Sequence, residues 1–69
     1  MDIYDINARP LDFDRGQRVE LHPGCDLWMR GARYGVVIGH TRNFVEVEMD
    51  HPQVSRRAHK FAPSLLRRV

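Results

Sequence analysis

One short stretch decides the fold of this chain, Phe44-Val45-Glu46-Val47-Glu48-Met49. Its apolar and acidic residues alternate, so the apolar side chains share one face of a strand and the carboxylates share the other. This period of two predicts a half-buried β-strand over Phe44–Met49. We expect Val45, Val47 and Met49 to point into a core and the two glutamates to face water.

Similar short runs occur on both sides of this strand, and turn residues such as His22-Pro23-Gly24 and Thr41-Arg42-Asn43 separate them. No window of 11 or more residues shows the apolar spacing of a helix. The only helix expected is a tight turn over residues 62–65. The sequence therefore predicts an all-β domain with five strands: Gln17–Leu21, Tyr34–Gly39, Phe44–Met49, Arg56–Phe61 and Leu66–Val69.

The length of 69 residues fits a single small domain. A chain of this size buries only about 60% of the surface that its unfolded form exposes, and its one cysteine, Cys25, excludes an intrachain disulfide. A closed sheet would enclose a core without a disulfide or a metal. The strand layout, with a long loop over Cys25–Gly31 and one helical turn before the last strand, predicts a small five-stranded SH3-like barrel over residues 15–69. Residues 1–14 form an N-terminal arm.

The alternation also predicts which side chains fill the core. Arg18 and Glu20 fall on the opposite face of the first strand from its apolar residues. Either Leu27 or Trp28 is expected to cover the core as a lid. The expected core residues are Val19, Leu21, Val37, Val45, Val47, Met49, Phe61 and Leu65.

Charge is distributed unevenly along the chain, although the net charge is only +2. The acidic residues dominate positions 1–14, the middle of the chain is balanced, and residues 51–69 are basic. Ten of the eleven basic residues are arginine, which favours bidentate contacts with phosphate or carboxylate and stacking on rings. The alternative is that these residues form solvated faces, partly paired with the acidic ones.

Several motifs together resemble small uncharacterised SH3-like proteins of phages and prophages. The matching segments are Gly16–Pro23, Trp28–Gly35, Val45–Asp50 and Phe61–Leu66. The segment Gly31–Val37 is more loosely similar to the glycine-centred turn and strand of KOW-type SH3-like modules. Many of those modules bind RNA, DNA or proteins of the transcription and translation machinery. The resemblance implies the fold more than the function, because one barrel hosts many unrelated sites.

Residues that could support catalysis or bind metal are present, but their spacing favours neither role. His22 and Cys25 have ligand-like spacing, whereas structural zinc usually takes two such pairs and the other histidines stand singly: His40, His51 and His59. Asp26 next to Cys25 disfavours the thiolate. We expect no enzyme activity, no metal and no cofactor.

The candidate binding residues combine aromatic rings with arginines. Four of them surround Gly31 in the first long loop: Trp28, Arg30, Arg33 and Tyr34. A second, basic component comprises Arg42, Arg56, Arg57 and Lys60. Rings beside arginines can stack on unpaired bases while guanidinium groups hold phosphates. We therefore expect a non-enzymatic module that binds RNA, DNA or a nucleic-acid-handling complex. For Trp28 taken alone, the role of core lid is favoured over a binding role, because a small barrel needs a large apolar lid.

The alternative function is a protein–protein adaptor or small assembly subunit without nucleic-acid binding. The acidic arm could dock on a basic partner or on the basic tail of a second copy, so homo-oligomerisation stays open. The longest apolar run is Val36-Val37-Ile38, far below the roughly 20 residues that span a bilayer. Residues 1–5 lack the basic start and apolar stretch of a secretory signal, so we expect no membrane association and a cytoplasmic location.

Overall fold

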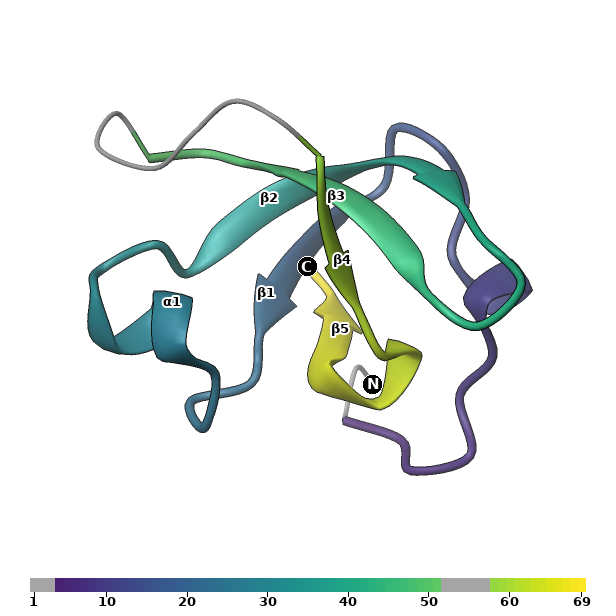
Figure 1. The fold of residues 1–69 in the computed structure, drawn as a ribbon, viewed down its shortest axis with the longest axis horizontal. Helices are drawn as coiled ribbons and strands as arrows, with labels where there is room; N and C mark the ends of the chain where they lie inside the picture. The colour runs from purple at the N-terminus through teal and green to yellow at the C-terminus, as the bar shows by residue number, and fades with distance from the viewer. Residues whose placement is uncertain (1–3, 52–57) are drawn as a thin grey trace.

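The computed structural model describes residues 4–51 and 58–69, and its strands form a single antiparallel sheet (Figure 1). The strand order is β4-β3-β2-β1-β5, with β4 and β5 at the two edges. The all-β prediction is confirmed, but the sheet is open and does not close into a barrel. The strands are β1 (Arg18–Leu21), β2 (Tyr34–His40), β3 (Val45–Met49), β4 (His59–Phe61) and β5 (Leu66–Arg68).

Three short helical segments accompany the strands in the described part of the chain. The 3-10 turn η2 (Pro63–Leu65) lies between β4 and β5, as the sequence predicts. A second 3-10 turn, η1 (Pro10–Asp12), lies in the arm. The helix α1 (Asp26–Met29) occupies part of the segment that the sequence predicts as a loop. Because α1 has only four residues, it is too short to produce a helical period in the sequence.

The alternating stretch forms β3 as expected. Val45, Val47 and Met49 are buried, whereas Glu48 is exposed. Opposite them, Gly35 of β2 allows the two strands to approach closely. A Cβ atom at this position would lie 2.6 Å from Val47 Cγ1 and 2.7 Å from the Glu48 carbonyl oxygen. Any side chain at position 35 would therefore force the strands apart.

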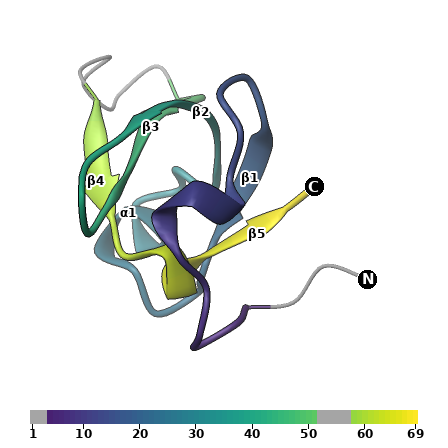
Figure 2. The ribbon, with the colours of Figure 1, turned by 90° about the vertical axis from the view of Figure 1, so that its right-hand side faces the viewer.

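A register shift in the pairing of β2 with β3 lies between Val37 and Gly39, which marks a β-bulge at Ile38. Bulges bend a strand and increase its twist. Figure 2 shows the sheet curling around its interior, with β4 and β5 on opposite sides. The same view shows η1 lying across the end of the curled sheet.

The core occupies the inside of the curl and contains every predicted core residue except Leu65. Leu65 is half-buried, and Leu66 is buried in its place. The reason is that η2 ends at Leu65, so Leu66 begins β5 opposite Leu21 and points inward. Leu27 and Trp28 both pack against the core. The sequence did not predict two further core residues, Phe13 and Ala32.

Phe13 shows that the arm contributes to the core, since its side chain is only 4% exposed. The ring of His40 donates a hydrogen bond from Nε2 to the Phe13 carbonyl oxygen. Three residues later, the Gly16 N–H donates to the Val37 carbonyl at 2.7 Å. The guanidinium carbon of Arg68 lies 5.6 Å from the Phe13 ring centroid. These contacts attach the end of the arm to β2 and β5.

The burial of Phe13 gives a test of the arm's structural role. Phe13→Ala should lower the free energy of unfolding by about 3–4 kcal/mol, because it leaves a cavity in a small core. Phe13→Leu should cost roughly 1 kcal/mol, so it stays measurable even if the alanine variant does not fold. The measurement is urea denaturation.

The matched control is Leu11→Ala, because Leu11 in the same segment is 81% exposed. This change should alter stability by less than about 0.5 kcal/mol. Equal effects at positions 11 and 13 would show that the arm does not pack as described.

Candidate functional site

The loop that follows α1 is built around a Schellman turn. The Ala32 N–H donates to the Leu27 carbonyl at 2.9 Å, and the Gly31 N–H donates to the Trp28 carbonyl at 3.0 Å. Gly31 has φ +94°, which a residue with a side chain rarely adopts. The turn reverses the chain and buries Ala32, so Arg33 is brought back over α1.

Arg33 stacks on Trp28 in this loop. The guanidinium carbon lies 4.6 Å from the centroid of the indole ring. Trp28 is half-buried and packs against the core, while Arg33 is exposed. The Leu21 N–H donates to the Arg33 carbonyl at 2.8 Å and fixes the backbone of Arg33 to β1. Trp28 is therefore a partial lid of the core and also the support of an exposed guanidinium.

The cations of this loop carry no carboxylate partner within the described part of the chain. Between described residues the ion pairs are Arg18 with Asp50 and Arg67 with Glu20. Arg30, at the C-cap of α1, and Arg33 are both exposed. Met29 beside them is 80% exposed, a feature that sequence reasoning missed. The alternation rules could not find Met29, because a four-residue helix has no second turn that defines a buried face.

Tyr34, the fourth predicted residue of the loop, lies on the other side of the sheet. Its cross-strand partner is Glu20, on the face of β1 opposite the core. The guanidinium carbon of Arg18 lies 5.3 Å from the Tyr34 ring centroid, and Arg18 is also paired with Asp50 at 3.0 Å. The structure thus separates Tyr34 from Trp28, which packs against the core side.

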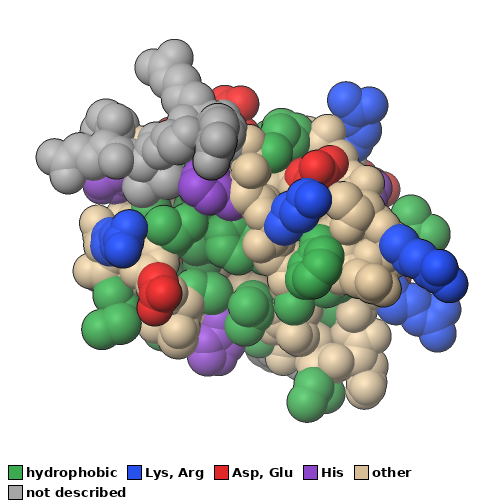
Figure 3. Space-filling view, viewed as in Figure 1, with side chains coloured by type: hydrophobic (Ala, Val, Ile, Leu, Met, Phe, Trp, Pro, Cys, Tyr) green, Lys and Arg blue, Asp and Glu red, His purple; other side chains and the backbone are tan. Residues whose placement is uncertain are grey.

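The two described residues of the second, basic component lie on different elements. Arg42 lies in the turn between β2 and β3, at the opposite end of β2 from α1 (Figure 1). Lys60 lies on β4 opposite Glu46. On the face in Figure 3, Lys and Arg side chains are separated by hydrophobic and acidic ones, and several gather at the right-hand end. Arg56 and Arg57 lie outside the described residues.

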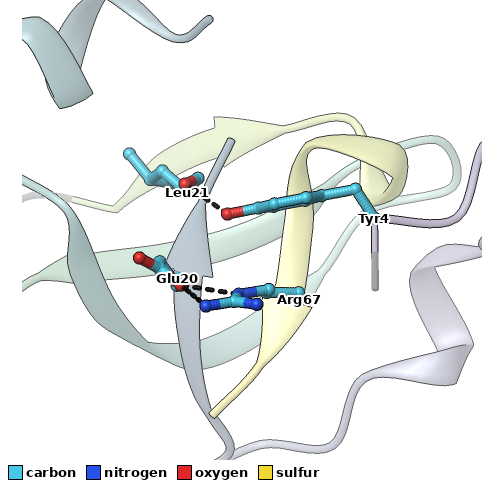
Figure 4. Close-up of polar contacts among 4 residues, drawn as sticks. All are labelled: Tyr4, Glu20, Leu21 and Arg67. Carbon is cyan, nitrogen blue, oxygen red and sulfur yellow. Dashed lines mark hydrogen bonds and ion pairs between the residues drawn. The ribbon is translucent and has the colours of Figure 1, made fainter. Parts of the chain in front are cut away.

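Arg67 forms an internal ion pair with Glu20, which lies on the face of β1 opposite the core. Glu20 is only 6% exposed, and Arg67 donates from Nε to its carboxylate at 2.6 Å (Figure 4). This hydrogen bond raises the pKa of Arg67, and desolvation of the cation makes the upward shift smaller. Arg67 also contacts Tyr4: its guanidinium carbon lies 5.7 Å from the centroid of the Tyr4 ring. The outward-facing carboxylate is buried because β5 and the arm cover it.

Tyr4 anchors the first described residues of the arm. Its hydroxyl donates to the Leu21 carbonyl at 2.6 Å (Figure 4), and its ring meets His22 edge-on at 4.8 Å between centroids. Burial raises the pKa of the Tyr4 phenol above its usual 10.0; the nearby Glu20 carboxylate adds to the shift and Arg67 opposes it.

The basic end of the chain makes contacts within the same molecule. Arg68 donates a hydrogen bond to the Asp12 carbonyl oxygen, in addition to its contact with the Phe13 ring. Together with the pair between Arg67 and Glu20, this contact holds both C-terminal arginines against β1 and the arm. These two arginines are therefore less available to a ligand than the sequence suggests.

The chemistry around Cys25 is that of a half-buried thiol. Burial raises its pKa above the usual value of 9.0; a hydrogen bond with the His22 backbone opposes this shift, and the Asp26 carboxylate adds to it. The expected direction of the Asp26 effect is confirmed. No group of three His, Cys, Asp or Glu side chains able to hold a metal is found among residues 4–51 and 58–69. No helix in this part of the chain is long and apolar enough to cross a membrane.

The two ion pairs provide a matched comparison. Arg67→Met leaves the buried Glu20 carboxylate without its cation, so the midpoint of urea denaturation should fall clearly. Arg18→Met removes a pair whose side chains are 48% and 58% exposed, and should cost less than about 1 kcal/mol. Equal midpoints for the two variants would contradict the burial of Glu20.

The raised pKa of Tyr4 predicts a loss of stability in alkali. Below pH 10.0 the phenol is neutral in both states, and its stabilising contribution is fully present. As the pH rises from 10.0 through the folded pKa, the unfolded state releases the proton more readily, so this contribution is lost. Tyr4→Phe should be about 1 kcal/mol less stable at neutral pH, because the bond to Leu21 is missing.

The measurement is urea denaturation of wild type and Tyr4→Phe at a series of pH values. The difference between the two proteins should shrink above pH 10.0. The other groups of the chain are the same in both proteins, so their contributions cancel in the comparison. A difference that stays constant in alkali would show that the hydroxyl is not buried against β1.

Comparison of the chain with protein-family models, with curated proteins and with solved structures finds no match. The function proposed below therefore rests on the residues and contacts described above.

Proposed function

We propose that this chain is a small non-enzymatic binding module of the SH3-like type found in phages and prophages, and that it binds nucleic acid or a nucleic-acid-handling complex. The strand order β4-β3-β2-β1-β5 and the 3-10 turn before β5 support the fold part of this proposal. Five short strands and a helical turn before the last one are the features from which the sequence predicts an SH3-like domain. The assignment of this curled sheet to the SH3-like barrel type is part of the same proposal.

The observation that carries the binding proposal is the stack of Arg33 on Trp28. It presents a guanidinium group without a carboxylate partner in the described part of the chain, beside the exposed Arg30. Guanidinium groups bind phosphate oxygens in a bidentate manner. Aromatic and guanidinium planes also accept stacked bases, each stack being worth about 1–3 kcal/mol. Nucleic acid supplies both partners in one ligand.

A second candidate, a protein-interaction module, is favoured by one observation. Met29 is 80% exposed beside Trp28 and provides a flexible apolar contact of the kind that protein-binding surfaces use. An apolar interface would keep its affinity at moderate salt, whereas phosphate contacts would not. The salt dependence of binding separates the two candidates.

The proposal predicts salt-dependent binding of a short oligothymidylate. Affinity should be micromolar or tighter at low salt and fall steeply towards moderate salt, as measured by fluorescence anisotropy of a labelled strand. Arg30→Ala and Arg33→Ala should each weaken binding, and each should reduce the slope of log K against log salt by about one.

The matched control is Arg18→Ala. Arg18 is already paired with Asp50 and contacts Tyr34 on the opposite face, so its loss should leave binding nearly unchanged. Absence of binding to RNA and DNA oligonucleotides at low salt would refute the proposal. Binding that is insensitive to salt and depends on Met29 would favour the protein-interaction candidate.

A further inference from the structure

We propose that Arg33, and not Trp28, is the residue on which the ligand stacks, and that the ligand is single-stranded nucleic acid with an unpaired base at this position. This inference rests on the proposed function and specifies its contact. Trp28 is then a positioning residue, because it acts through Arg33.

The Arg33 side chain limits access to the indole ring of Trp28. Trp28 packs against the core and is only partly exposed. The Arg33 guanidinium lies over the ring, 4.6 Å from its centroid. A base that approaches the loop from solvent therefore meets the guanidinium before it meets the indole.

The Arg33 guanidinium can make two kinds of contact with a ligand. It is planar, its carbon lies over the indole ring, and Arg33 as a whole is exposed. The outer face can take a stacked base while the N–H groups in its plane donate to a phosphate. No carboxylate among the described residues forms an ion pair with Arg33. One side chain thus provides both a stacking surface and an anion contact.

The position of Arg33 over Trp28 is held by contacts on both sides. The Schellman turn at Gly31 reverses the chain, and the bond from the Leu21 N–H to the Arg33 carbonyl fixes the backbone on the other side. The indole then restricts the long side chain. Because less freedom is lost when the ligand binds, a preorganised arginine binds more tightly than a mobile one.

Stacking on a guanidinium favours single-stranded over double-stranded nucleic acid. A stacking surface the size of one guanidinium needs a base whose face is free. In a duplex each base face is covered by its neighbours, whereas single strands expose them. Binding by Arg33 should therefore discriminate between unpaired and paired strands of equal charge.

The test uses Arg33→Lys, which keeps the charge and removes the plane. Its fold is checked by circular dichroism. Three probes of equal length are titrated at one salt concentration: oligothymidylate, an abasic strand with the same phosphates, and a duplex. Arg33→Lys should weaken binding of oligothymidylate about fivefold to tenfold. It should weaken binding of the abasic strand by no more than about twofold, because the positive charge is kept. Wild type should prefer oligothymidylate over the other two probes.

Two further variants keep the result interpretable. Arg18→Lys, at a residue that is paired with Asp50 on the opposite face, is the control for a general arginine effect and should change none of the affinities more than about twofold. Trp28→Phe keeps an aromatic support and should retain most of the binding, whereas Trp28→Leu should resemble Arg33→Lys. Trp28 is the only tryptophan of the chain, so its fluorescence reports directly on this site.

The outcomes are distinguishable. Oligothymidylate binding that Arg33→Lys leaves intact overturns this inference and leaves the proposed function standing. Loss of binding in Trp28→Phe, together with strong fluorescence quenching by thymidylate but not by the abasic strand, would show that bases stack on the indole itself. Equal affinity for all three probes would reduce the site to a charge contact. No binding of any probe removes the proposed function as well.

Discussion

The burial of the inner face of an open, curled sheet is the constraint on which the rest of this structure depends. Five short strands supply most of the apolar side chains, but an open sheet cannot enclose them alone. Residues outside the strands complete the core: Phe13 from the arm, and Ala32 with the partly buried Leu27 and Trp28 from the segment around α1. The connecting segments are therefore parts of the core as well as links between strands.

This double role explains why the candidate site lies where it does. The Schellman turn that buries Ala32 also returns the chain so that Arg33 lies over Trp28. The inner part of the indole completes the core, and the remainder supports a cation at the surface. A change at Gly31 would disturb packing and binding together, since its φ of +94° places both Ala32 and Arg33.

The sequence predicted what depends on local periodicity and missed what depends on partners far apart. The alternation in β3 fixed its buried face correctly because each residue's position follows from its neighbours. Glu20 has the parity of a solvent-facing residue, and it is buried because β5 and the arm cover it, with Arg67, 47 positions away, as its ion-pair partner. Leu66 is buried where the sequence predicted Leu65, because η2 ends at Leu65 and β5 begins at Leu66. For the site, the sequence placed Trp28, Arg30 and Arg33 in one segment around Gly31. The contact of Arg33 with Trp28 and the separation of Tyr34 became visible only in the folded chain.

The attachment of both chain ends to β1 has a consequence for folding. β5 and the arm lie far apart in sequence, yet Arg67 and Tyr4 meet over Glu20, and Arg68 reaches Asp12 and Phe13. The hairpins of β2, β3 and β4 can form locally, whereas these contacts require closure of a loop that spans most of the chain. Ordering of one end therefore favours ordering of the other, and loss of either should release both in a single cooperative step.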